Sequence, residues 1–141
     1  MSIEDIQAEI VSEMSVYDDW TDKYSYLIES GKKLEALDER LKTGQYLISG
    51  CQSRVWLVPE LRDGKIWFRG ESDAIIVKGL VALLLRIVSG HTPQEILEAD
   101  FHFIGDVGLD QYLSPTRSNG MLAMTKQIKL YALAYEKISR K

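Results

Sequence analysis

The most diagnostic stretch for the architecture of this chain is RVWLVPELRDGKIWFR, residues 54–69. Both ends of the stretch are rich in β-branched, aromatic and aliphatic residues, and Asp63-Gly64 lies between them. An Asp-Gly pair between such runs is typical of a type I′ hairpin turn, which needs positive φ at both central residues. We therefore expect an antiparallel hairpin with strands near residues 54–61 and 65–69. Pro59 cannot donate to a strand ladder, so its strand is expected at an edge or with a bulge there.

Helical patterns precede the hairpin. Apolar residues recur at helical spacing over residues 3–14, and the remaining positions of that segment are largely acidic. Asp18 and Asp19 supply a cap and negative charge for a second helix, which Gly31 is expected to end or kink. The short apolar run at residues 46–48 is interpreted as an edge strand that leads into the segment before the hairpin.

Helical patterns also follow the hairpin. Ser72 or Asp73 is expected to cap an apolar helix over residues 74–89, and residues 92–95, TPQE, predict a capping box with proline at the first helical position. The last helix is predicted to carry a core stripe at three- and four-residue steps, formed by Met121, Met124, Ile128, Tyr131, Tyr135 and Ile138. The whole chain, residues 1–141, is therefore predicted to be one compact α+β domain in which a small antiparallel sheet packs on helices.

Composition narrows the classes of partner. A net charge of −4 disfavours a nucleic-acid backbone as partner, because phosphate binding needs concentrated positive charge. The most apolar stretch, residues 74–88, is too short and too charged to span a bilayer, which needs about 20 apolar residues. The N-terminus shows no secretory signal, and a single cysteine fits a reducing compartment. We expect a cytoplasmic protein with neither nucleic acid nor membrane as partner.

The sequence has one cysteine, Cys51, in the segment GCQSRVW at residues 50–56. One thiol forms neither an intramolecular disulfide nor a multi-cysteine metal site. A lone intracellular cysteine is commonly a small buried hydrophobe. Here Gly50 precedes it and polar Gln52 and Ser53 follow, which favours a turn before a strand. Local sequence leaves a reactive and an inert thiol both open, because reactivity depends on the pKa.

Other candidate chemistry has less support. His91 and His102, with Asp100 and Asp106, match no standard metal-ligand spacing, so no metal site is expected. A cysteine–histidine hydrolase would need a local signature that is absent from the segment around Cys51. No glycine-rich phosphate loop is present, and no cofactor is expected.

Three charged residues each allow two interpretations. Lys78 interrupts an apolar helix, and either its stem lies along apolar surface or its charge serves a reactive thiol. Arg117 lies in the first turn of the last helix, where the helix dipole disfavours positive charge, so it is expected to meet an internal carboxylate or a bound protein. Asp73 is most simply the cap of its helix.

Three longer motifs carry a family resemblance. GCQSRVW at residues 50–56 resembles the GCQSxVW signature of the SufE family. SDAIIVKGL at residues 72–80 and LSPTRSNG at residues 113–120 resemble that family's SDAxIVKGL and LSPxRxxG segments. The order and approximate spacing of the motifs agree, and the similarity extends from about Trp20 to the last helix. With this resemblance, the reactive interpretation of Cys51 is favoured.

The resemblance implies a function in iron–sulfur cluster assembly and a fold related to that of the U-type cluster scaffolds. Members of the family bind a pyridoxal-phosphate-dependent cysteine desulfurase of SufS or CsdA type and activate it. They accept sulfane sulfur as a persulfide and pass it to the iron–sulfur scaffold. By this resemblance Cys51 is the acceptor, held by a loop that shelters it in an apolar cavity, and Trp56, Leu57 and the helix at 74–88 are expected to line that cavity.

The remaining family positions are expected near the loop or the docking face. These are Gly50, Gln52, Ser53, Asp73, Lys78 and Arg117. Three rival functions stay open. A U-type cluster scaffold needs several ligands per cluster, and a thiol redox protein commonly keeps a resolving cysteine. A structural or interaction protein with an inert Cys51 is the third.

Overall fold

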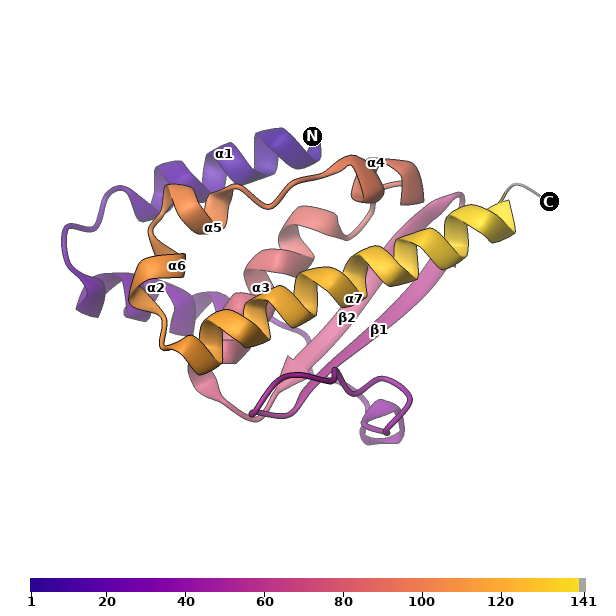
Figure 1. Ribbon diagram of the computed structural model, residues 1–141, viewed down its shortest axis with the longest axis horizontal. Helices are drawn as coiled ribbons and strands as arrows, with labels where there is room; N and C mark the ends of the chain where they lie inside the picture. The colour runs from indigo at the N-terminus through magenta and orange to yellow at the C-terminus, as the bar shows by residue number, and fades with distance from the viewer. Residues whose placement is uncertain (140–141) are drawn as a thin grey trace.

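A computed structural model describes residues 1–139 of the chain, in which seven α-helices and one 3₁₀-helix surround a single hairpin (Figure 1). The helices before the hairpin are α1 (Ile3–Met14), α2 (Trp20–Lys32) and the 3₁₀-helix η1 (Glu39–Leu41). The strands are β1 (Val55–Arg62) and β2 (Lys65–Ser72). The helices that follow are α3 (Ile75–Val88), α4 (Pro93–Glu98), α5 (Phe103–Asp106), α6 (Leu109–Tyr112) and α7 (Pro115–Ser139).

The predicted hairpin is confirmed. β1 and β2 pair antiparallel in unbroken register from Val55 opposite Ser72 to Arg62 opposite Lys65. Asp63 and Gly64 have φ values of 53° and 77°, the positive pair that a type I′ turn needs. Pro59 lies within this continuous register, so the edge position, and not a bulge, accommodates it.

Residues 46–48 lie along the outer edge of β1, but they form a single bridge and no strand. The Ile48 N–H donates to the Val55 carbonyl at 2.8 Å, and the Leu57 N–H donates to the Tyr46 carbonyl at 3.1 Å. The edge-strand prediction was thus correct in place and wrong in extent. This short pairing fixes the point at which the chain enters the loop that carries Cys51.

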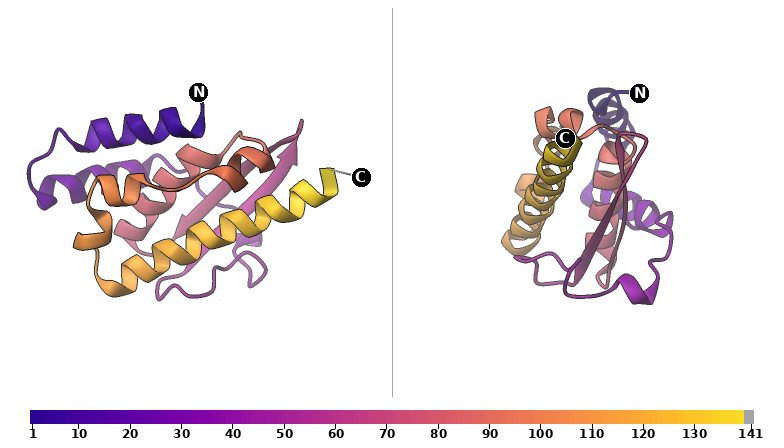
Figure 2. Two further views of the ribbon diagram at one scale, coloured as in Figure 1. Left: turned by 45° about the horizontal axis from the view of Figure 1, so that its top comes forward. Right: turned by 90° about the vertical axis from the view of Figure 1, so that its right-hand side faces the viewer.

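Helix α3 is the centre of the core. Nine of its residues are buried, and it contacts α1, α2, β2 and α7. In the right-hand view of Figure 2, the hairpin and α3 lie between α7 on one side and α2 on the other. This arrangement buries apolar residues of α3 on more than one side and explains why its sequence is nearly continuous in apolar residues.

Two glycines bring α2 and α3 together. A Cβ on Gly79 would lie 2.2 Å from the Leu27 carbonyl oxygen, and a Cβ on Gly31 would lie 3.0 Å from the Gly79 nitrogen. Gly31 was expected to end or kink its helix, and α2 ends one residue further on, at Lys32. Gly31 also permits close backbone approach between two helices.

The predicted helix cap is confirmed for α4 and wrong for α3. Thr92 and Glu95 form the predicted capping box of α4, and Gly90 follows α3 with φ of 81°. At the start of α3, however, the N-cap is Ala74, and no side chain caps the helix. Asp73 bonds elsewhere, as described below. The predicted cap from Ser72 or Asp73 was therefore wrong.

The core stripe of α7 is confirmed over most of its length. Met121, Met124 and Ile128 are buried, and Tyr131 and Tyr135 are partly buried. Ile138 is 57% exposed, so the stripe ends before that position. Among residues 1–139, no helix combines the length and hydrophobicity needed to cross a membrane.

Candidate functional site

The loop that carries Cys51 lies against α7. Gly50 has φ of 89°, a left-handed conformation that strains other residues, and a Cβ there would lie 3.3 Å from the Ala123 Cβ. The Cys51 thiol is half-buried and donates to the carbonyl oxygen of Gly120, with Sγ and oxygen 3.6 Å apart. The glycine before the cysteine therefore lets the chain turn so that the thiol faces the helix.

A small, mostly apolar cavity lies beside the thiol. Its volume is about 20 Å³. Three segments line it: the loop with Cys51, Gln52 and Ser53, α3 with Val77, and α7 with Thr116, Arg117, Gly120 and Met124. The three motifs of the sequence thus meet at one place.

Burial raises the pKa of the Cys51 thiol above the ordinary value for cysteine. Among residues 1–139 no charged group, Lys78 and Arg117 included, contributes to this shift of the thiol pKa. At neutral pH the resting group is therefore the protonated thiol, which is a weak nucleophile. The resting thiol is thus sheltered and mostly unreactive.

Asp73 fixes the end of the cysteine loop. Its Oδ1 accepts from the Arg54 N–H at 3.0 Å, while its own N–H donates to the Arg54 carbonyl at 3.2 Å. Two hydrogen bonds therefore join the residue before β1 to the link between β2 and α3. Asp73 is a positioning residue of the loop and not the helix cap that its sequence position suggested.

Some of the other predicted site residues line the cavity of the thiol and others do not. Gln52, Ser53 and Arg117 line the cavity, and the Arg117 N–H donates to Ser114 Oγ at 3.3 Å at the start of α7. Lys78 is half-buried on α3 and does not line the cavity. No carboxylate partner of Arg117 is found in the part of the chain that the structure describes, so the internal-carboxylate interpretation lacks support.

The expected cavity lining was right for α3 and wrong for β1. Val77 contributes to the wall, whereas Trp56 packs with Leu37 and Val58 in a separate cluster and Leu57 belongs to the main core. Sequence reasoning missed Gly120 and Met124 as neighbours of the thiol. The available signals were the final glycine of the LSPTRSNG motif and the position of Met124 on the predicted core stripe.

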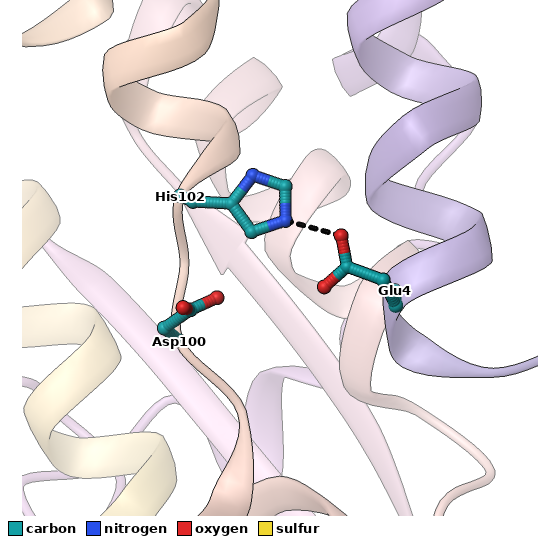
Figure 3. A group of neighbouring side chains, drawn as sticks. All are labelled: Glu4, Asp100 and His102. Atoms are coloured by element: carbon teal, nitrogen blue, oxygen red, sulfur yellow. Dashed lines mark hydrogen bonds and ion pairs between the residues drawn. The ribbon is translucent and has the colours of Figure 1, made fainter.

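A second group of functional side chains lies away from the thiol (Figure 3). Glu4, Asp100 and His102 place one ligand atom each within 4.8 Å of one another. His102 Nε2 lies 2.6 Å from Glu4 Oε1, and its Nδ1 lies 2.6 Å from Asp106 Oδ2. Both imidazole nitrogens are therefore already paired with carboxylates, an arrangement that ties α1 to α5 and holds a protonated imidazole.

Of the four residues considered as metal ligands from sequence, three gather here and His91 does not. His91 is buried, and its Nε2 lies 3.0 Å from the carbonyl oxygen of Met1. The carboxyl groups beside His102 raise its pKa, with Asp106 the larger influence and Glu4 the smaller. The group is best described as an ion-pair cluster between helices.

A much larger hollow shares no lining residue with the thiol cavity. It measures about 510 Å³ and lies between α2, α3 and β2. Three of its polar groups are bonded together: Arg86 donates to Glu13 at 2.7 and 2.9 Å, and the Tyr26 hydroxyl donates to Glu13 at 2.9 Å. Burial and the bond to Glu13 raise the pKa of Tyr26 to about 12. One side of the hollow is therefore occupied by an ion-pair network of Glu13, Tyr26 and Arg86.

Similarity to known proteins agrees with this geometry. A family model described as SufE, an Fe–S metabolism associated domain, matches residues 8–132. A curated SufE-like protein of Rhizobium meliloti (strain 1021), named as uncharacterized, is 40% identical over 126 residues, which cover 86% of this chain and 90% of that protein. The solution structure of a hypothetical protein from Thermus thermophilus matches with a TM-score of 0.75 over 92% of this chain and 94% of that one. Its 18% identity makes this a likeness of fold alone.

Fold and site together define a small α+β protein whose only thiol rests in a cavity between a loop and the last helix. The resemblance that the three motifs carry is confirmed by the family match and by the similar protein. The chain belongs to the SufE family, whose domain is associated with iron–sulfur metabolism.

Proposed function

We propose that this protein is a persulfide carrier of iron–sulfur cluster assembly. Cys51 accepts sulfane sulfur from a pyridoxal-phosphate-dependent cysteine desulfurase and passes it to the scaffold on which clusters are built. The observation that carries this proposal is the placement of the single cysteine on a loop, with its thiol turned into an apolar cavity where the three family motifs meet. The proposed setting is the cytoplasm, and residues 1–141 act as one domain.

The transfer step is a thiol exchange that balances without an oxidant. The Cys51 thiolate attacks the outer sulfur of the desulfurase persulfide. A new sulfur–sulfur bond forms at Cys51, the bond between the two sulfurs of the desulfurase persulfide breaks, and the desulfurase cysteine leaves as a thiolate. The proton of the Cys51 thiol goes to a base of the complex or to solvent. The same exchange, with Cys51 now as the leaving group, delivers the sulfur to the recipient.

The resting geometry supports storage, and the reaction needs the loop to open. Burial keeps the thiol protonated at neutral pH, because it raises the pKa of the thiol. Gly50 has the backbone freedom to act as the hinge of an opening movement. Asp73 holds the far end of the loop at Arg54, so the mobile part is confined to residues between Gly50 and Arg54. Opening exposes the thiol to the partner and returns its pKa toward the ordinary value.

Exposed groups near the loop provide the docking face in this proposal. Arg117 lies exposed at the cavity, and Gln52 is exposed on the loop itself. Lys78 is half-buried on α3, next to Val77 in sequence, and supplies positive charge on the adjoining side. These residues recognise the desulfurase, while Cys51 alone makes the covalent bond. The protein acts as carrier and activator, and the desulfurase performs the catalysis.

The rival functions fit the chain less well. A cluster scaffold needs several thiolate or imidazole ligands, and this chain has one cysteine and two histidines that pair with other groups. A redox protein of the common kind uses a resolving cysteine, and the sequence contains no second one. An inert cysteine has no need of the left-handed glycine that turns it toward the cavity.

The proposal is tested by transfer of labelled sulfur. The protein is incubated with a cysteine desulfurase and [³⁵S]cysteine, and the mixture is separated on a non-reducing gel. We expect label on this protein that a thiol reductant removes, and none on Cys51→Ser. Equal labelling of Cys51→Ser, or no label beside a desulfurase that labels itself, contradicts the proposal.

A further inference from the structure

Gly120 is an unusual residue for its position. It is buried, the sixth residue of the 25-residue helix α7, and its φ is not positive. Glycine inside a helix is less favourable than alanine. No cap or turn requires glycine here, so either packing or function explains its presence.

Packing does not explain it. A Cβ built on Gly120 meets one neighbouring atom within 4 Å, the Cys51 Sγ at 3.5 Å, which is an ordinary van der Waals contact. Gly79 gives the contrast, because a Cβ there would lie 2.2 Å from the Leu27 carbonyl oxygen. Alanine therefore fits at position 120 while the loop holds a plain thiol, and it would favour the helix.

The space that a methyl group would take adjoins the thiol cavity. The cavity measures about 20 Å³, and a site needs roughly 10–15 Å³ of such space to hold one water-sized atom. The walls are mostly apolar, although Gln52, Ser53, Thr116 and Arg117 also border the cavity. A water there would need two to four polar partners. Among residues 1–139, the one buried side-chain polar atom without a partner is His91 Nδ1, which lies outside the cavity lining. The cavity therefore has room for one polarisable atom against mostly apolar walls.

We infer that Gly120 is a positioning residue for the persulfide: the place where its side chain would stand is left open for the sulfane sulfur on Cys51. This inference rests on the proposed carrier function and adds the residue that makes room for the cargo. The sulfane sulfur lies about 2 Å from Sγ, the length of a sulfur–sulfur bond. A methyl group 3.5 Å from Sγ would occupy the same space. With alanine at position 120 the outer sulfur must turn away from α7 toward solvent, where small thiols reach it.

The test compares how long the persulfide survives. The wild type, Gly120→Ala and the control Gly105→Ala are loaded with a cysteine desulfurase and cysteine and separated from both. Each is then exposed to glutathione, and intact mass follows the loss of the added sulfur. Gly105 is a matched control because it is also helical, in α5, and a Cβ there meets nothing within 4 Å.

All three proteins are expected to accept one sulfur, because loading takes place with the loop open. Gly120→Ala should lose it about tenfold faster than the wild type and Gly105→Ala, since exchange depends on access to the sulfur. Iodoacetamide labelling of the unloaded thiol should be unchanged in Gly120→Ala, because alanine fits beside a plain thiol. Equal persulfide lifetimes in Gly120→Ala and the wild type overturn the inference but not the carrier function. A parallel rise in thiol labelling of Gly120→Ala has the same consequence, because it would mean that the loop is displaced. Failure of the wild type to accept sulfur overturns the carrier function itself.

A second variant keeps the test decisive if Gly120→Ala does not fold. Val77→Ile adds one methyl group to the wall of the cavity that α3 provides and leaves α7 unchanged. It is expected to shorten the lifetime of the persulfide in the same direction. Unchanged lifetimes in every folded variant that fills the cavity overturn the inference.

Discussion

Asp73 and Arg54, 19 residues apart in sequence, hold each other through two hydrogen bonds. The Asp73 carboxylate accepts from the Arg54 N–H at 3.0 Å, and the Asp73 N–H donates to the Arg54 carbonyl at 3.2 Å. Arg54 is the last residue before β1, so this pair marks where the cysteine loop ends and the rigid hairpin begins. In the proposed opening movement, this pair would hold the end of the loop in place.

Replacing Asp73 by alanine is expected to loosen the loop. The Arg54 N–H loses its acceptor, and a typical hydrogen bond contributes about 1 kcal/mol to stability. We expect a loss of that order in the free energy of unfolding and faster alkylation of Cys51 by iodoacetamide. Asp18→Ala serves as the control, because Asp18 is exposed and remote from the loop in sequence. An alkylation rate equal to that of the wild type would show that Asp73 does not restrain the loop.

Replacing Gly79 by alanine is expected to destabilise the fold severely. The added Cβ would lie 2.2 Å from the Leu27 carbonyl oxygen, so α2 and α3 must separate. Overpacking of this kind typically costs about 1–3 kcal/mol, and backbone contact puts this case at the upper end. Chemical denaturation of Gly79→Ala beside Gly105→Ala measures the difference. A variant as stable as the control would mean that the two helices are not packed through their glycines.

The thiol of Cys51 is expected to titrate at higher pH in the folded protein than in a peptide. Burial raises its pKa, so the thiolate that reacts with iodoacetamide appears only at more alkaline pH. The protonated thiol therefore contributes to the free energy of unfolding below the ordinary cysteine pKa. This contribution is lost as the pH rises through the pKa of the thiol in the folded protein. The alkylation rate is measured against pH for the protein and for a peptide of residues 49–54. A midpoint in the protein at or below that of the peptide contradicts the sheltered thiol.

His102 is expected to make stability depend on pH near neutrality. Its pKa is raised by Asp106 and Glu4. A raised folded pKa means that the stabilisation is complete below the ordinary histidine value of about 6.5 and falls as pH rises through the folded value. His102→Gln should lose this part of the pH dependence, seen by denaturant unfolding at a series of pH values from about 5.5 to about 8.5, which bracket the histidine range. Parallel curves for wild type and variant would show that the ion-pair cluster does not clamp α1 to α5.

Features set by local chemistry were predictable from sequence. The Asp63-Gly64 turn and the Thr92 capping box each depend on a few neighbouring residues, and both formed as expected. The cap of α3 was not predictable, because the Asp73 carboxylate had two possible donors. The sequence shows the nearby helix amides, whereas the Arg54 N–H comes into range only in the folded chain.

Cys51 could also be predicted from the sequence as the candidate reactive residue, whereas its neighbours in the fold could not. Cys51 stood out as a lone thiol after glycine, and its motif carried the family resemblance. Its contact with Gly120 spans 69 positions and depends on how α7 crosses the loop. The expected lining by Trp56 and Leu57 failed for a simple reason. Alternate residues of a strand face opposite sides, so Trp56 went to the cluster with Leu37 and Leu57 to the main core.

The most direct measurement of the carrier function is the intact mass of this protein after mixing with a cysteine desulfurase and cysteine without reductant. The account predicts a gain of the mass of one sulfur atom, located by digestion on the peptide that contains Cys51 and absent in Cys51→Ser. No gain with desulfurases of proven activity, or an equal gain in Cys51→Ser, would contradict it.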